Sequence, residues 1–246
     1  MLISVSNLIT KSWQDYTKNL HEWMLFAALM FAPSFILVLA GSFLGFLSVY
    51  APALTGSTDL IVLVLLALSV VVGFWSSLAL THAAGTFITK KQTDHWKEHY
   101  AAALPLLWPA LVTGAFVTIA VTFGVILFII PGIIFLGWYF FAGYRVIFEN
   151  ESGFKALRES KKMMFGRWWA VAWRLVVGVT VFSFLFSLAI FVVGVAVNFL
   201  PVSEDLISVV TIISHLALSS IFLIPTTTLV VSNLYFSLRE NPVSSK

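Results

Sequence analysis

The polar side chains with the clearest chemical potential lie inside an apolar stretch near the C-terminus. Thr211, His215 and Ser219 recur at every fourth position, so a helix would carry them on one face. His215 lies about 12 Å into this stretch at 1.5 Å per residue, close to the middle of a bilayer. An ionisable group at that depth is a candidate for moving ions or small molecules. The alternative is a neutral imidazole that is hydrogen-bonded to a neighbouring hydroxyl.

A run of cations between residues 145 and 174 is the second candidate. It holds seven Lys and Arg against three Glu, and Trp168, Trp169 and Trp173 lie beside it. Near an anionic membrane surface each cation contributes about 1 kcal/mol. The candidate contacts to anionic lipid headgroups are Lys155, Arg158, Lys161, Lys162, Arg167 and Arg174. The alternative is that the run only orients the chain, next to an aromatic belt.

Sequence motifs for catalysis are missing. The chain has no HExxH, GxSxG or Walker motif, and no carboxylates lie within its apolar stretches. It also has no cysteine, which excludes thiolate chemistry and Cys-based metal sites. We therefore expect no metal and no cofactor, and an intramembrane enzyme is only a minor alternative. A net charge of +3 gives no reason to expect nucleic-acid binding.

The composition indicates that these groups lie in a lipid bilayer and not in a soluble protein. Of the 246 residues 60% are hydrophobic and 10% are charged, whereas a soluble domain has about 25% charged residues. About 20 apolar residues suffice to cross a bilayer as a helix, and six runs approach or exceed that length. They cover residues 24–49, 60–85, 106–130, 133–148, 175–199 and 207–231. We predict an all-α, polytopic membrane protein in which residues 1–246 form a single domain.

The fourth run is the shortest. Only Pro131 and Gly132 separate it from the third run, so these two residues are predicted to form the turn. We expect a full crossing, because backbone that turns back inside the bilayer needs protein to cover its polar groups. A shallow re-entrant hairpin is the alternative.

The cations are sorted onto one side of the predicted spans. All 14 Lys and Arg lie before run 1, between runs 2 and 3, at or between the ends of runs 4 and 5, or after run 6. The opposite loops contain only acidic charges, namely Asp59, Glu204 and Asp205. Because cations favour the cytoplasmic side, both termini are predicted to be cytoplasmic.

Amphipathic segments precede three of the runs, at residues 4–20, 93–104 and 153–165. In the first, one face at helical spacing consists of Val5, Ile9, Trp13, Tyr16 and Leu20. We predict helices that lie in the cytoplasmic headgroup layer. The order of surface helix, span, turn and span thus occurs three times, which favours a threefold hairpin repeat starting near Ser4, Thr93 and Ser152. The alternative is that any protein with an even number of spans shows this layout.

Small side chains form stripes at spacings of four in the first two runs. Such stripes let helices approach closely, so we predict bundle packing, with a homodimer or another membrane-protein partner as the alternative. The residues are Gly41 and Gly45 in run 1, and Ser69, Gly73, Ser77, Thr81 and Gly85 in run 2.

A segment of about 45 residues from position 130 carries a set of spaced motifs. They are Ile130, Pro131 and Gly132; Glu149 and Glu151; Ala156, Leu157, Arg158 and Ser160; and Gly166, Trp168 and Trp169. This segment resembles the six-span integral-membrane domain that is fused to bacterial glycerophosphodiester phosphodiesterases, and its stand-alone relatives. Lys161 departs from that pattern, which usually has Trp. The resemblance implies a bacterial inner (cytoplasmic) membrane and carries over no catalytic residue.

Two functions remain open at this point. The first is a non-enzymatic inner-membrane protein, either a scaffold or an accessory that interacts with lipid, with the bilayer and its anionic lipids as partners. The second is a small-molecule or ion transporter that uses the polar face of the sixth run.

Overall fold

The computed structural model describes residues 2–50, 55–90, 95–199, 201 and 203–242, and regular structure in these ranges is entirely helical. This confirms the all-α prediction. In chain order the helices are α1 (Val5–Lys18), α2 (Leu20–Tyr50), α3 (Thr55–Lys90), α4 (Trp96–Ala103), η2 (Leu104–Leu106), α5 (Leu107–Leu127), α6 (Ile129–Tyr139), α7 (Ala142–Glu149), α8 (Gly153–Met164), α9 (Trp168–Asn198), α10 (Glu204–Leu218), the π-helical η3 (Ser219–Leu223) and α11 (Ile224–Glu240).

Six helical stretches in the described part are long and apolar enough to cross a membrane, one for each predicted run. They are Leu20–Phe46, Leu60–Lys90, Trp96–Leu127, Ile129–Glu149, Trp168–Asn198 and Glu204–Glu240. The chain is therefore a polytopic membrane protein.

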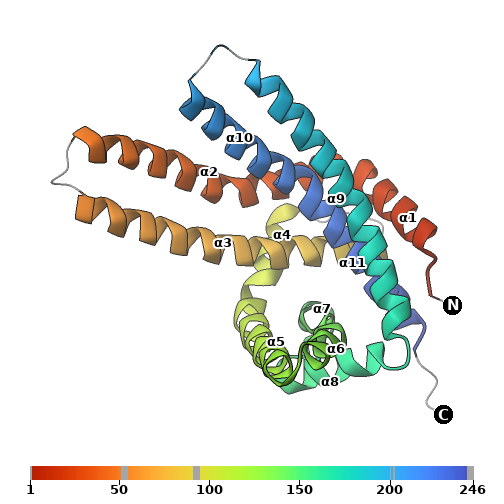
Figure 1. The fold of residues 1–246 in the computed structure, drawn as a ribbon. Coiled ribbons are helices and arrows are strands. Elements are labelled where there is room, and N and C mark those ends of the chain that lie inside the picture. Colours follow the sequence, from red (N-terminus) through yellow and green to blue (C-terminus); the bar gives the residue numbers. More distant parts are fainter. Residues whose placement is uncertain (1, 51–54, 91–94, 200, 202, 243–246) are drawn as a thin grey trace.

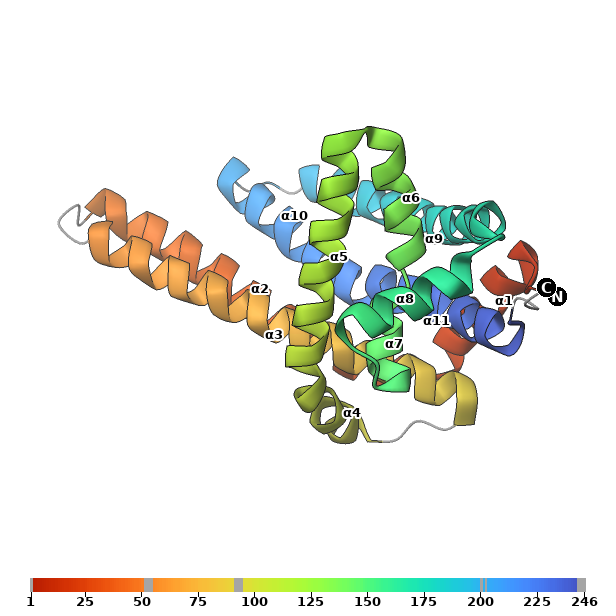
Figure 2. The same ribbon diagram turned by 90° about the horizontal axis from the view of Figure 1, so that it is seen from below.

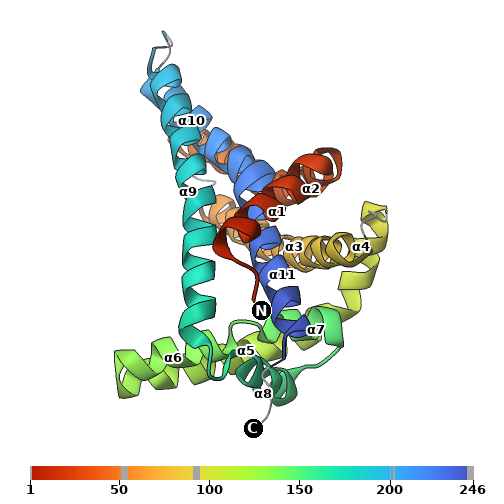
Figure 3. The ribbon, with the colours of Figure 1, turned by 90° about the vertical axis from the view of Figure 1, so that its right-hand side faces the viewer.

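Three helical hairpins diverge from a common packed region, as Figures 1, 2 and 3 show. The hairpins are α2/α3, α5/α6 and α9/α10. The packed region, which we call the hub, consists of α1, α4, α7, α8 and α11 with the adjoining ends of α2, α3 and α9. Side chains toward the hairpin tips are exposed although they are apolar, with Ile126 at 76% and Phe199 at 84%. In a bilayer the exposed apolar side chains along the arms of the hairpins face lipid acyl chains.

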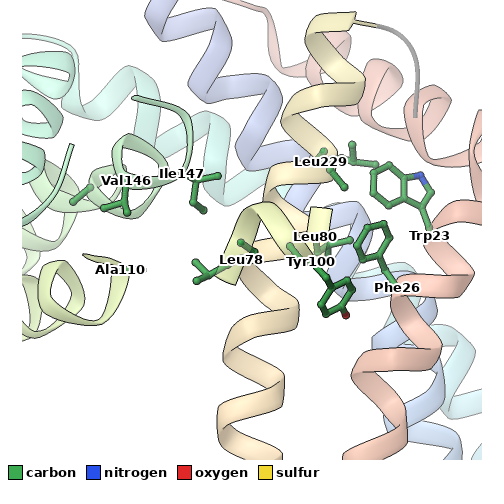
Figure 4. Close-up of a cluster of buried hydrophobic side chains, with 14 of the residues drawn as sticks. Trp23, Phe26, Leu78, Leu80, Tyr100, Ala110, Val146, Ile147 and Leu229 are labelled. Carbon is green, nitrogen blue, oxygen red and sulfur yellow. The ribbon is translucent and has the colours of Figure 1, made fainter. Parts of the chain in front are cut away.

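Buried side chains concentrate in the hub. One cluster joins eight helices around α3 and α4, and Figure 4 shows members of it. They include Trp23, Phe26, Leu78, Leu80, Tyr100, Val146, Ile147 and Leu229. A second cluster surrounds the other side of α11 and includes Leu8, Phe141, Met164, Val171, Phe182, Leu234 and Tyr235. Because α11 contributes to both, it is the central helix of the hub.

The amphipathic helices share one register, which supports the threefold repeat. The three helices are directly preceded by Ser4, His95 and Ser152. In each helix the residues four and eight positions after this preceding residue are buried. These positions are Leu8 and Ser12, His99 and Ala103, and Ala156 and Ser160. The second repeat thus starts at His95, and Thr93 lies outside the described residues.

Each amphipathic helix packs on the returning arm of the preceding repeat. The indole Nε1 of Trp75 in α3 donates to the carbonyl of Tyr100 in α4, at 3.0 Å. Ser160 of α8 donates to the carbonyl of Trp138 in α6, at 2.7 Å. The hydroxyl of Tyr16 in α1 donates to the carbonyl of Ile221, just before α11, at 3.0 Å. The first repeat therefore closes on the last, and the three repeats form a closed cycle.

The predicted turn at Pro131 and Gly132 is wrong. The chain bends at Phe128, with φ −164° and ψ 151°, and α6 already begins at Ile129. Pro131 lies in the first turn of α6. Backbone N–H groups in a first turn have no partner within the helix, so the N–H that proline lacks costs no helical hydrogen bond. Gly132 lies next to Gly124, which lets α5 and α6 approach closely.

The predicted fourth span is also interrupted. It consists of α6, which ends at Tyr139, and α7, which begins at Ala142. Ser160 binds a carbonyl in the last turn of α6, so α8 packs where α6 ends. At 1.5 Å per residue α6 rises about 16 Å, which is about half of a 30 Å hydrocarbon core. A full crossing therefore needs α6 and α7 together.

The small-residue stripes differ in what they contact. A Cβ added at Gly41, Gly45 or Gly73 would meet no atom within 4 Å, so the close approach predicted there is wrong within this chain. Gly85 does lie against a neighbour, the aromatic ring of Phe148 in α7. The hydroxyls of the stripe bond to carbonyls: Ser69 to Pro33 and Leu65, Ser77 to Phe74, and Thr81 to Ser77.

Candidate functional site

The hydroxyl groups on the polar face of the sixth span bond to their own helix and not to His215, unlike the hydrogen-bonded imidazole considered as the alternative. Thr211 and Ser219 donate to carbonyls of their own helix, those of Ile207 at 2.8 Å and Leu216 at 2.9 Å. The imidazole of His215 instead packs edge-on against Phe186 of α9, with ring centroids 5.1 Å apart. His215 lies at the surface.

The sixth span changes from an α-helix to a π-helix directly after His215 and its neighbours. Residues 219–223 form the π-helical η3, and Ser220 within it is buried. Such π-helical turns are rare and frequently occur at functional sites. The sixth span is thus irregular within one turn of His215.

Helix α8 is positioned so that most of its cations point outward. Its first residue, Gly153, has a φ of +58°, which glycine adopts without strain, and its N–H donates to Thr113 of α5 at 2.9 Å. The stripe of Ala156, Ser160 and Met164 is buried in the hub. The opposite face carries Lys155, Arg158 and Lys162, whose side chains are 61%, 68% and 64% exposed.

Two glutamates pair with these cations. Glu151 lies 3.4 Å from Lys155, and Glu159 lies 2.7 Å from Lys162 and 3.4 Å from Arg158. The hydrogen bond from Lys162 holds the pKa of Glu159 below its usual value, so this carboxyl is charged at neutral pH. Exposed pairs of this kind contribute about 0 to 1 kcal/mol. An anionic headgroup can therefore compete for the cations.

An apolar groove of about 440 Å³ lies between α5, α6 and α8. Arg158 and Lys161 are the charged residues of its lining, and Lys161 Nζ lies 4.2 Å from the centre of the Trp138 ring. The rest of the lining comes from the three helices: Phe116, Ile119 and Ala120, then Tyr139, then Phe154 and Leu157. The groove therefore joins an apolar surface to two cations.

Arg167 and Arg174, two of the six predicted lipid contacts, are bound to the chain itself. The guanidinium of Arg167 donates to the carbonyls of Met163, Leu238 and Asn241, which ties the start of α9 to the end of α11. Burial lowers the pKa of Arg167. Arg174 donates to the carbonyls of Ile3 and Ala170 at 2.7 and 2.6 Å. The structure thus gives both a role in holding the N- and C-terminal segments together.

Several polar contacts of the hub are not predicted from the sequence. The Nδ1 atoms of His82 and His99 lie 3.0 Å apart between α3 and α4. The side-chain amide of Asn233 in α11 donates to Ser12 and Asp15 of α1, at 3.3 and 3.1 Å. Arg239 and Tyr235 of α11 contact Glu149 at 3.0 and 3.3 Å. The cyclic packing of the repeats brings these partners together, and no local motif indicates them.

Comparison of the chain with protein-family models, with curated proteins and with solved structures gives no match. The resemblance of the segment from position 130 to the six-span bacterial family therefore stays a prediction. The function has to be argued from the geometry of the site.

Proposed function

We propose that this chain is a non-enzymatic membrane protein that binds anionic phospholipid at α8, as a scaffold or lipid-interacting accessory. The observation that carries the proposal is the groove between α5, α6 and α8. Its apolar lining suits an acyl chain, and Arg158 and Lys161 suit the headgroup phosphate. Arginine and lysine between membrane helices on the cytoplasmic side are a common arrangement for headgroup binding.

The distribution of charge supports a cytoplasmic position for the hub. Every described Lys and Arg lies in the hub, and the described parts of the three hairpin tips carry none. Since cations favour the cytoplasmic side, we place both termini there, in a bacterial cytoplasmic membrane. The groove then faces the inner leaflet, where anionic lipids meet the cations of α8.

Removing both cations of the groove is expected to weaken lipid binding. In the Arg158→Gln/Lys161→Gln double variant, the loss of about 1 kcal/mol per cation corresponds to an increase of about 30-fold in the Kd for phosphatidylglycerol. Native mass spectrometry of the detergent-solubilised chain, titrated with phosphatidylglycerol, measures this change.

The matched control removes the same charge elsewhere. Lys18→Gln/Lys97→Gln changes α1 and α4, away from the groove, and is expected to leave the Kd within about threefold, since exposed charges act weakly at a distance. If the two double variants weaken binding equally, the lipid responds only to net charge and the groove is not its site.

A transporter is the second candidate, and the π-helical segment beside His215 is the observation that favours it. A water-filled path along this face would make cysteines placed at Thr211, His215 and Ser219 react with a membrane-impermeant thiol reagent. The lipid-binding proposal expects all three to stay unreactive in intact membranes, because the face then borders lipid. Labelling of a cysteine at Ser203, in the outer loop, serves as the positive control. Reaction at all three span positions would favour transport.

A further inference from the structure

A cavity of about 220 Å³ lies where α7, α8, α11 and the start of α9 meet. Four cations line it, each from a different part of the chain: Arg145, Lys162, Arg167 and Arg239. Glu159 is the one acid in its lining. Two acids outside the lining also pair with these cations, Glu151 with Arg145 and Glu149 with Arg239, so one positive charge remains in excess.

The arginines are held in place before any ligand arrives. Arg145 donates through Nε and one Nη to Glu151, at 2.9 and 2.7 Å. Arg239 pairs with Glu149 at 3.0 Å, and Arg167 is fixed by three backbone carbonyls. Neither Glu149 nor Glu151 lines the cavity. A ligand would therefore meet guanidinium groups whose positions are already fixed, which lowers the cost of binding.

The cavity offers more cationic hydrogen-bond donors than the groove, with three guanidinium groups and one ammonium group against one of each. The groove has two cations and an otherwise uncharged lining, which suits the single charge of a phosphodiester. A phosphomonoester carries about 1.5 to 2 negative charges at pH 7, and guanidinium groups match its oxygens in geometry. We propose that the cavity binds a phosphomonoester group, carried either by a lipid or by free phosphate. The cavity and the groove share no lining residue, although Glu159 of the cavity also pairs with Arg158 of the groove at 3.4 Å.

The test uses the full chain purified in detergent, with two probes. Inorganic phosphate is titrated by calorimetry, and short-chain phosphatidic acid by native mass spectrometry with and without phosphate present. Binding of both with mutual competition indicates any phosphomonoester. Binding of phosphatidic acid alone indicates a lipid source, and binding of phosphate alone indicates a soluble one. In each case Arg239→Gln is expected to raise the Kd of the probe that binds by about tenfold or more, because it removes a charge-assisted hydrogen bond.

Controls separate this site from the groove. Arg239 is 47% exposed, so its replacement is tolerated by the fold, and Lys162→Gln provides a second variant at an exposed position. Arg239→Gln is expected to keep the wild-type Kd for phosphatidylglycerol, whereas Arg158→Gln/Lys161→Gln keeps the wild-type Kd for phosphate or phosphatidic acid. If neither probe binds, or if both cavity variants bind as tightly as wild type, the proposal is overturned.

Discussion

Replacing Phe141 with alanine is expected to lower the free energy of unfolding by about 3 to 5 kcal/mol. Phe141 is fully buried at the junction of α6 and α7. Its aromatic ring lies 5.8 Å from that of Tyr235 in α11 and 5.9 Å from that of Tyr144. The substitution opens a cavity beside the central helix of the hub, and the neighbouring repeats cannot collapse into it without breaking their own contacts. Equilibrium unfolding in mixed micelles with increasing SDS measures the loss.

Phe123 provides the matched control for this substitution. It lies on α5 toward the hairpin tip and is 59% exposed, so in a membrane its ring meets acyl chains. Phe123→Ala is expected to change stability by about 0.5 kcal/mol or less. Equal losses at the two positions would mean that the hub is no more important for stability than the hairpin tips.

Gly132→Ala is expected to destabilise the α5/α6 hairpin by about 1 to 3 kcal/mol. A Cβ at this position would lie 2.9 Å from the backbone nitrogen of Val125 and would also overlap that residue's side chain. Because one of the obstructing atoms belongs to the backbone, relief requires the two helices to separate. The same micelle unfolding experiment measures the effect, and proteolysis at the loosened hairpin tip reports where it acts.

The same substitution at Gly114 should have the opposite sign. A Cβ at Gly114 of α5 would meet nothing within 4 Å, and alanine is favoured over glycine in a helix by about 1 kcal/mol. Gly114→Ala is therefore expected to be neutral or stabilising. A loss of stability at Gly114 that matches the loss at Gly132 would contradict the close approach of α5 and α6.

The features that the sequence predicts well are those that depend on neighbouring residues in the chain. Six apolar runs predict the six spanning stretches, because a backbone in hydrocarbon has to satisfy its own hydrogen bonds along a long apolar stretch, whatever its partners. The amphipathic helices are predicted within a few residues because their apolar side chains recur at helical spacing. The cations of α8 are found from their spacing, since Lys155, Arg158 and Lys162 lie on one helical face.

The features that the sequence misses depend on which helices meet. Of the apolar face predicted for α1 only Tyr16 is buried, and the other buried residues of this helix are Leu8 and Ser12. Ser12 is buried because Asn233 hydrogen-bonds to it from the far end of the chain. Arg167 illustrates the same limit, since its carbonyl partners Leu238 and Asn241 lie more than 70 residues away. Neither partner can be identified from a local pattern.

The closed cycle of repeats has a consequence for how the protein is made. Helix α1 leaves the ribosome before its partner Ile221, which follows Tyr16 by 205 residues. At about 5 to 20 residues per second, translation needs about 10 to 40 s to supply that partner. Throughout this interval α1 is without its packing surface, and its amphipathic character suits it to wait at the membrane surface. Assembly of the hub can finish only after η3 and α11 have been made, so a chain that stops before them would leave the docking surface on α1 exposed.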